Sequence, residues 1–263
     1  MPSRSSLPAW PKAILFDLDD TLWPIGPVIV QAEQALYGWL GEHAPAVARA
    51  HSIDSLRAAR MALLAAEPAF HLDLAALRRA ALHAAFEAAG EDSARLDAAM
   101  DLFLAARNAV TPYPDVLPVL ERLGRHALLG SISNGNADLR AIGLDHHFRV
   151  SLAAHQLGVA KPDPAIFHAA CAALDVAPHE ALYVGDDPRL DVEGARNAGL
   201  RAVWLRRESG PGAAAVPDGV PADATADAVC ADFGALLDWL LAHHAAPPAS
   251  PPRQTAQRRS ERA

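Results

Sequence analysis

Three carboxylates crowd into four positions near the start of the chain, at Asp17, Asp19 and Asp20. They directly follow the short apolar run 13–16, which is typical of a buried parallel strand. The carboxylates are therefore expected at the carboxyl end of a strand, where open α/β sheets place their ligands. Because like charges this close repel one another, burying them needs a balancing cation or bound phosphate chemistry. The segment indicates either a divalent-metal site or a solvated acidic turn.

A hydroxyl side chain and a lysine follow two later apolar runs. Ser133 comes directly after the run 127–132 and is followed by Asn134 and Gly135. A hydroxyl with exposed backbone N–H groups can cradle a phosphate, although the same residue types commonly cap a helix. Lys161 lies in the loop after the next, weaker run, where an ammonium group could neutralise phosphoryl oxygens. A solvent-exposed lysine is the alternative.

A second carboxylate cluster follows the apolar run 181–184 and contains Asp186, Asp187 and Asp191. Asp186 is nearest to the strand and is the natural metal ligand. Asp191 falls in the first turn of the next helix, where it could hold a metal-bound water or simply suit the helix dipole. Oxygen ligands of this kind favour Mg²⁺ over a softer metal.

A further apolar run lies at 201–205, and helical patterns at 164–174 and 188–198 lie between the runs. This alternation predicts an α/β fold with a Rossmann-like parallel sheet. The stretch 27–110 does not follow the alternation, because it contains helical patterns only and is far longer than one crossover needs. Its helical patterns break at Pro45, Pro68 and Gly90. We therefore expect an inserted all-helical cap. We predict a flexible N-terminus at 1–12 and an α/β core formed by 13–26 together with 111–244. The cap is expected at 27–110 and a disordered tail at 245–263. The segment 206–230 is expected to be loop and 232–243 a last helix.

Composition narrows the classes of partner. The 263 residues carry a net charge of −8, so no basic face for nucleic acid is expected. Cys171 and Cys230 lie outside any metal or redox motif, which fits a reducing compartment. No apolar run approaches the ~20 residues of a membrane span, and residues 1–12 show no signal-peptide pattern. We expect a cytoplasmic protein that binds a small molecule and neither nucleic acid nor membrane; the sequence does not indicate its oligomeric state.

The motifs at 17–21, Ser133, Lys161 and 185–191 occur in the same order as the four motifs of the haloacid dehalogenase-like (HAD) hydrolase superfamily, which this chain resembles over about residues 12–205. The helical insertion between the first two motifs resembles the helical type of cap. The resemblance implies a phosphatase that works through an aspartyl-phosphate, and a cap that closes over the leaving group.

By this resemblance Asp17 is the nucleophile, and Asp19 protonates the leaving alcohol and then activates water. Mg²⁺ is held by Asp17, the backbone carbonyl of Asp19, and Asp186. Ser133 and the N–H groups of Asn134 and Gly135 hold phosphoryl oxygens, and Lys161 balances charge. The resemblance gives Thr21, Asp187 and Asp191 supporting roles, with Thr21 counted beside the substrate-binding residues.

Segments 16–22, 67–73, 133–137 and 184–187 also look like the branch that hydrolyses flavin mononucleotide and 5-amino-6-(5-phospho-D-ribitylamino)uracil, near riboflavin biosynthesis. Phosphoglycolate, a sugar phosphate or a nucleotide are alternative substrates, and a phosphomutase is an alternative enzyme. A dehalogenase is disfavoured because its family pattern lacks the second aspartate of the first motif. A phosphorelay receiver lacks the helical insertion, and a phosphate-binding protein would not need every catalytic residue type.

Four side chains are candidates for contact with the leaving group. Trp23 could stack on a planar ring, although packing between core and cap is the commoner fate of so large a side chain. His71, Asp73 and Arg78 lie in the expected cap, where a solvated helix face is the alternative.

Overall fold

The computed structural model describes residues 8–207 and 226–251. A sheet of six parallel strands forms its centre, in the order β3-β2-β1-β4-β5-β6. The strands are β1 (Ala13–Phe16), β2 (Leu128–Ser133), β3 (Val150–Ala153), β4 (Ala181–Gly185), β5 (Arg201–Leu205) and β6 (Ala228–Cys230). The predicted parallel α/β core is confirmed. The expectation of loop throughout 206–230 is wrong for β6, whose three residues pair with β5 but are too few to show a periodic pattern.

Helices cover both faces of the sheet because successive strand residues point to opposite sides. Ile14 and Phe16 of β1 pack in a cluster with α6 (Val116–Leu123) and α11 (Phe233–His243). Ala13 and Leu15 pack on the other side, with α9 (Pro164–Ala173) and α10 (Gly194–Asn197). All four residues of β1 are buried, as the continuous apolar run predicted.

Short helical pieces complete the core around the strands. A π-helical turn, η5 (Pro188–Glu193), precedes α10, so the two together occupy most of the helix expected over 188–198. The remaining pieces are α7 (Leu139–Ile142), α8 (Ala154–Leu157), η3 (Asp145–His147) and η4 (Pro178–Glu180).

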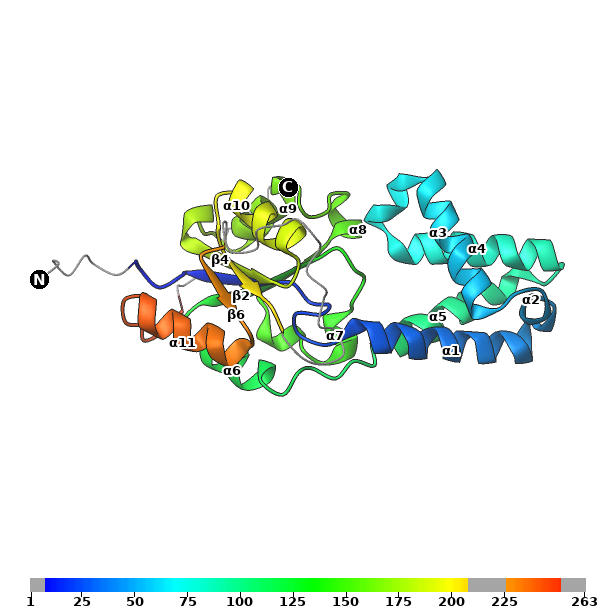
Figure 1. Cartoon of the computed structure of the whole chain (residues 1–263), viewed down its shortest axis with the longest axis horizontal. Helices are drawn as coiled ribbons and strands as arrows, with labels where there is room; N and C mark the ends of the chain where they lie inside the picture. The colour runs from blue at the N-terminus through cyan, green and yellow to red at the C-terminus, as the bar shows by residue number, and fades with distance from the viewer. Residues whose placement is uncertain (1–7, 208–225, 252–263) are drawn as a thin grey trace, which may run out of the picture.

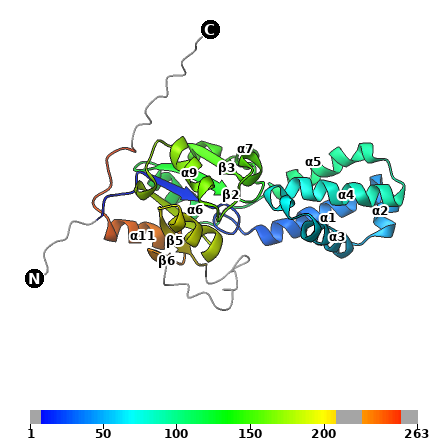
Figure 2. The same ribbon diagram turned by 90° about the horizontal axis from the view of Figure 1, so that it is seen from above.

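The inserted segment forms a separate lobe of helices beside the core (Figures 1 and 2). Its elements are α1 (Ile25–His43), α2 (Pro45–Ala50), α3 (Ile53–Ala66), η1 (Pro68–Leu72), α4 (Leu74–Ala89), η2 (Ser93–Arg95) and α5 (Leu96–Arg107). The expected breaks all coincide with element ends: Pro45 and Pro68 open α2 and η1, and Gly90 closes α4 in the left-handed conformation. Leu40, Phe86 and Phe103 belong to a hydrophobic cluster of the lobe's own. We call this lobe the cap.

A buried carboxylate joins three helices of the cap. The Glu33 side chain on α1 is 5% exposed and accepts hydrogen bonds from Arg57 (2.6 Å) and Arg60 (2.9 Å) of α3. Arg78 of α4 lies 3.5 Å from the same carboxylate, with its guanidinium carbon 3.6 Å from the centre of the Phe103 ring. Burial, with the charge of Arg60 second, lowers the pKa of Arg78 to about 9. Arg78 is therefore a buried residue of the cap and not part of a solvated face.

Glu33→Gln should destabilise the protein by about 3 kcal/mol, because it leaves the buried Arg78 without a counter-charge. Arg57→Gln is the matched control, and it should cost about 1 kcal/mol or less because the Arg57 side chain is 44% exposed. Urea unfolding monitored by circular dichroism measures both. Equal losses in the two variants would contradict the central role of Glu33.

Both ends of the described chain run along the core. Trp10 is 7% exposed and packs in the core cluster, so order begins before residue 13. The backbone N–H of Ala245 donates to the carbonyl of Pro8 (3.0 Å). The rest of the expected tail, 252–263, lies outside the described residues. Within the described residues the structure contains no helix long and apolar enough to cross a membrane.

Candidate active site

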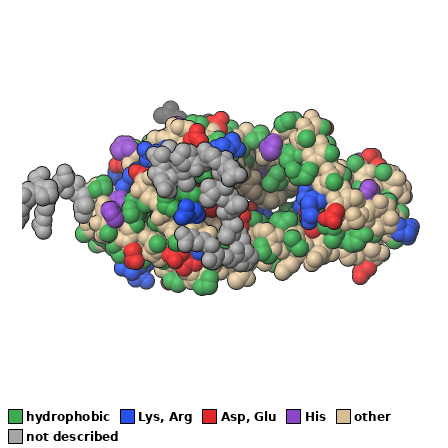
Figure 3. All heavy atoms as spheres, in the orientation of Figure 1, with side chains coloured by type: hydrophobic (Ala, Val, Ile, Leu, Met, Phe, Trp, Pro, Cys, Tyr) green, Lys and Arg blue, Asp and Glu red, His purple; other side chains and the backbone are tan. Residues whose placement is uncertain are grey.

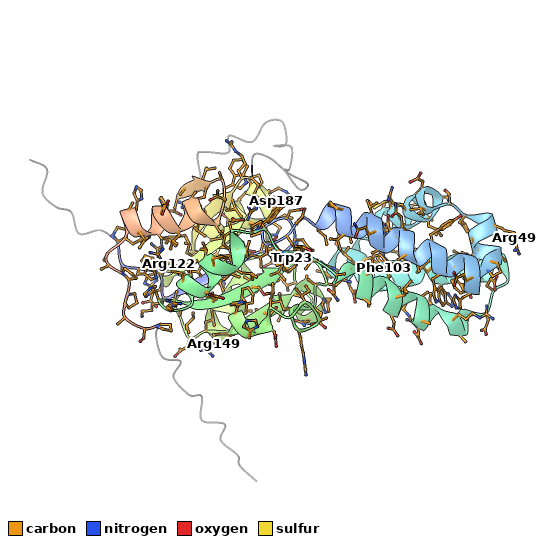
Figure 4. The ribbon with its side chains drawn as sticks, turned by 90° about the horizontal axis from the view of Figure 1, so that it is seen from below. Trp23, Arg49, Phe103, Arg122, Arg149 and Asp187 are labelled. Carbon is orange, nitrogen blue, oxygen red and sulfur yellow. The ribbon has the colours of Figure 1, made fainter. Side chains whose placement is uncertain are left out.

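The candidate residues meet at the carboxyl edge of three adjacent strands. β1 lies between β2 and β4, with Phe16 opposite Ser131 on one side and Val184 on the other. Asp17 follows β1 directly, Ser133 ends β2 and Asp186 follows β4. Figure 4 shows Trp23 and Asp187 at the end of the core that faces the cap, with Arg122 at the opposite end. Figure 3 shows the surface hollowed between the core and the cap.

Lys161 is the centre of a buried polar network. Its ammonium group donates to Asp17 Oδ1 (2.5 Å), Asp191 Oδ1 (2.6 Å) and the Tyr183 hydroxyl (3.0 Å). These three acceptors use all three of its protons. The Asn134 side chain fixes the Lys161 backbone at both polar atoms, accepting from its N–H (2.8 Å) and donating to its carbonyl (2.9 Å). The Asn134 side chain therefore positions Lys161. The backbone N–H of Asn134 is the group left for the predicted contact with phosphate.

Carboxylate oxygens of Asp17, Asp186 and Asp191 lie within 4.8 Å of one another. Burial raises the pKa of Asp17 to about 7, with Lys161 opposing that rise. Burial together with the charge of Asp17 raises the pKa of Asp186 to about 9. Three carboxylates and one ammonium group leave an excess of negative charge that a divalent cation would offset. The donor set is all oxygen and so fits a hard metal ion.

Asp191 belongs to this cluster, although the family resemblance implies only a supporting role for it. One of its oxygens pairs with Lys161, and the other accepts the backbone N–H of Asp187 (3.0 Å). A Cβ on Gly185 would lie 2.3 Å from Asp191 Oδ2, so a glycine is needed there. The Asp187 carboxylate caps η5 by accepting from the N–H groups of Arg189 and Leu190 (both 2.8 Å).

The Asp19 side chain lies beside the turn after β2. A Cβ on Gly135 would lie 2.7 Å from Asp19 Oδ2 and 3.3 Å from Ser133 Oγ, which places the three residues together. The N–H of Gly135 donates to Ser133 Oγ (2.9 Å). Thr21 donates from its hydroxyl to Asp186 Oδ1 (2.9 Å), so its side chain ties two site loops together. Its predicted supporting role describes this contact better than substrate binding does.

Trp23 packs in the core with no exposed surface and donates from Nε1 to Asp19 Oδ1 (2.8 Å). The stacking hypothesis for Trp23 is therefore wrong, because its ring faces are covered. Asp73 accepts the N–H groups of Ala75 and Ala76 as the N-cap of α4. His71 lies exposed in η1.

Two residues that the sequence did not single out contact the predicted catalytic groups. Tyr183 is an inward-facing residue of β4, and its hydroxyl donates to the carbonyl of Ile132 (3.1 Å) while it accepts from Lys161. Arg107 is the last residue of α5, and its NH2 group donates to both Asp19 oxygens (2.8 and 2.6 Å). Arg107 lies far from every motif in the sequence, and Tyr183, although it precedes the motif at 185–191 by two residues, reads as one more residue of a buried strand. Only the fold shows that both contact the site.

Metal-free protein should lose stability as the pH rises. The pKa values of Asp17 (about 7) and Asp186 (about 9) exceed their ordinary value of 3.8, so the folded state binds protons more tightly than the unfolded chain. The stability contributed by these protons is present below about pH 4 and is lost as the pH rises through about 7 and 9.

Differential scanning fluorimetry in EDTA, with and without excess Mg²⁺, measures this dependence. Asp186→Asn should flatten the decline in Tm between about pH 6 and pH 9, because it removes the group with the higher pKa. Mg²⁺ should restore several degrees to the wild type at the alkaline end. An equally steep decline in both proteins would contradict the assigned proton binding.

The chain is similar to known proteins over most of its length. The model of the haloacid dehalogenase-like hydrolase family matches residues 11–199. The chain is 34% identical over 203 residues to the 5-amino-6-(5-phospho-D-ribitylamino)uracil phosphatase YigB of Escherichia coli (strain K12), covering 76% of this chain and 85% of that protein. It is 40% identical over 129 residues to a phosphoserine phosphatase of Thermus thermophilus, covering 47% of this chain and 52% of that protein.

The crystal structure of a 2-haloacid dehalogenase from Pseudomonas syringae pv. Tomato DC3000 is similar in fold. It superposes with a TM-score of 0.76 at 40% identity, covering 88% of this chain and 97% of that one. The family match over most of the chain, the YigB-like relative and the acidic cluster at the carboxyl edge of the sheet lead to one conclusion. The chain belongs to the haloacid dehalogenase-like hydrolase family and is a hydrolytic enzyme.

Proposed function

We propose that this protein is an Mg²⁺-dependent phosphomonoester hydrolase that acts through an aspartyl-phosphate on Asp17. One observation carries the proposal: Lys161 fixes Asp17 Oδ1, while Oδ2 accepts no hydrogen bond from any described residue. A carboxylate that is held at one oxygen and free at the other is oriented for attack on phosphorus. The 27–110 segment serves as the cap that closes over the leaving group.

Four side chains and two backbone N–H groups carry out the proposed chemical steps. Asp17 Oδ2 attacks phosphorus, and the bond from phosphorus to the leaving oxygen breaks. Asp19 gives that oxygen a proton and then takes one from the water that cleaves the aspartyl-phosphate. Ser133 and the N–H groups of Asn134 and Gly135 hold phosphoryl oxygens, and Lys161 offsets the charge of the nucleophile.

Asp17, Asp186 and the backbone carbonyl of Asp19 would hold the Mg²⁺ ion. When bound, the ion supplies positive charge that reduces repulsion between the nucleophile and the phosphate dianion. The oxygen donors and the raised pKa values of Asp17 and Asp186 support this assignment.

Asp19 favours phosphate-ester hydrolysis over dehalogenation, the activity in the name of the Pseudomonas syringae structure. A phosphatase needs an acid for the leaving alcohol, whereas a departing halide needs no proton. The Asp19 carboxylate lies beside Ser133 and Gly135, the residues proposed to hold the phosphoryl group. This placement supports a role at the leaving oxygen.

Flavin mononucleotide and 5-amino-6-(5-phospho-D-ribitylamino)uracil are the substrates that we propose first. The activity named for YigB and the segments at 16–22, 67–73, 133–137 and 184–187 support them. Phosphoglycolate, sugar phosphates and nucleotides are the alternatives.

A phosphate-release screen with Mg²⁺ over all these compounds, with a 2-haloacid tested for halide release, checks the proposal. We expect turnover of phosphomonoesters, with flavin mononucleotide among the better substrates, and no halide release. Poor turnover of flavin mononucleotide beside good turnover of another ester would overturn the substrate. Halide release without phosphate release would overturn the proposed reaction.

A further inference from the structure

We propose that Arg107, which comes from the cap, positions Asp19 and also contacts the substrate. Its NH2 group orients the Asp19 carboxylate, and its NH1 group donates to a non-bridging oxygen of the bound phosphoryl group. This inference rests on the proposed phosphatase function and adds a cationic contact to the site.

The Asp19 carboxylate is held from two sides. Arg107 NH2 donates to Oδ1 (2.8 Å) and to Oδ2 (2.6 Å), and Trp23 Nε1 donates to Oδ1 (2.8 Å). Trp23 is fully buried and Arg107 is 2% exposed, so neither donor is free to swing away into solvent. The acid/base group is therefore set in one orientation before the substrate arrives.

The other end of the same guanidinium group has no partner. Arg107 NH1 is buried and makes no hydrogen bond to any residue that the structure describes. A buried donor left unpaired is destabilising, and more so when it is charged, so native proteins rarely keep one without a reason. A ligand oxygen that arrives during the reaction would complete the hydrogen bonding of the group.

The position of Arg107 fits a phosphoryl oxygen. Its NH2 group lies 3.5 Å from the point that a Cβ on Gly135 would occupy, and Ser133 Oγ lies 3.3 Å from the same point. Ser133 and Gly135 are the proposed phosphate cradle. Because the guanidinium group is planar and offers two parallel donors, NH2 can hold Asp19 while NH1 holds the phosphate.

The charge of the site also calls for a second cation from the protein. Among the described residues, Lys161 is the one cation that forms ion pairs with the cluster of Asp17, Asp186 and Asp191, through Asp17 and Asp191, and a phosphate dianion adds further negative charge. One divalent ion offsets only part of this total. Arg107 offsets the charge of Asp19 when that carboxylate is ionised, and it adds net positive charge to the site when Asp19 carries the proton for the leaving oxygen.

Arg107 also connects the phosphate to the cap. It ends α5, the last cap helix, and the Asn108 side chain directly after it accepts the backbone N–H of Asp138 (3.1 Å). The competing role is a purely structural link between cap and core, which we call a strut. A strut needs only the ion pair between Arg107 and Asp19, whereas the proposed role also needs Arg107 NH1 as a second donor.

The test compares Arg107→Gln, Arg107→Lys and a control, Arg201→Gln, as Mg²⁺-loaded enzymes. Arg201 also has a buried nitrogen, Nε, without a partner among the described residues. Arg201 is the first residue of β5 and so lies at the amino end of that strand, whereas the site lies at the carboxyl ends. Isothermal titration calorimetry with inorganic phosphate gives the affinity, and steady-state hydrolysis of p-nitrophenyl phosphate gives kcat and KM. Thermal unfolding reports the stability of each variant.

We expect Arg107→Gln to weaken phosphate binding at least about tenfold, the loss of one charged hydrogen bond, and to raise KM as well as lower kcat. Arg107→Lys should bind phosphate several-fold more weakly than the wild type, because one ammonium group cannot serve both partners at the guanidinium spacing. Arg201→Gln should bind phosphate like the wild type.

Wild-type phosphate affinity in Arg107→Lys would overturn the proposal in favour of a strut, since lysine can keep the ion pair. That variant also decides the question if Arg107→Gln does not fold. A wild-type protein that binds no phosphate would overturn the inference too. Phosphate binding that depends on Arg107, with no hydrolysis of any ester, would keep the inference and refute the phosphatase function.

Discussion

Asp17→Asn is expected to abolish phosphate release, with kcat falling by about 10⁴-fold or more, because an amide cannot form the aspartyl-phosphate. The fold should survive the change. Burial raises the pKa of Asp17 to about 7, so its ionised form costs stability above that pH and the neutral amide removes this cost. The variant should therefore unfold at a Tm no lower than that of the wild type in EDTA near pH 8.

Asp187→Asn is the matched control for Asp17→Asn. Asp187 lies in the loop after β4, and its carboxylate accepts hydrogen bonds from the described residues as the cap of η5, which an asparagine can also do. Its kcat should stay within a few-fold of the wild type. Substantial activity in Asp17→Asn, measured with protein free of deamidation, would refute the assigned nucleophile.

Lys161→Met is expected to reduce both stability and activity strongly. Lys161 is 5% exposed and is the ion-pair partner of Asp17 and Asp191. Its removal leaves two buried carboxylates unpaired, a change that typically costs about 3–5 kcal/mol. Activity should fall by about 10²-fold or more, because the charge that offsets the nucleophile and the phosphate is lost.

The other lysine of the chain provides the control for this variant. Lys12 pairs with Glu180 at 2.6 Å, but its side chain is 53% exposed. Lys12→Met should therefore change the stability by about 1 kcal/mol or less and leave activity intact. Denaturant unfolding of both variants decides the matter. Equal stability losses would show that the buried network around Lys161 contributes no more than a surface ion pair.

The fold could be predicted largely because strong local signals mark its elements. Continuous apolar runs predicted β1, β2, β4 and β5, and Pro45, Pro68 and Gly90 predicted breaks between cap helices. The edge at which Asp17, Ser133 and Asp186 meet follows from parallel pairing and right-handed crossovers alone. β6 was missed because three residues are too few for a periodic signal.

Contacts between distant segments could not be predicted in the same way. Arg107 pairs with Asp19 across 88 positions, and Tyr183 reads in the sequence as one more residue of a buried strand. The sequence does not predict that Asp191 approaches Asp17, because this approach depends on the π-helical turn and on the small size of Gly185. Such contacts depend on tertiary packing, which periodicity does not encode.

The most direct measurement of the central claim is mass spectrometry of enzyme quenched in acid during turnover of a phosphomonoester with Mg²⁺. Trypsin should release the peptide 13–49, which lies between Lys12 and Arg49. The account predicts that a fraction of this peptide carries one phosphoryl group on Asp17, and that Asp17→Asn carries none. Rapid hydrolysis by an enzyme whose peptide never carries that group, even at early quench times, would contradict it.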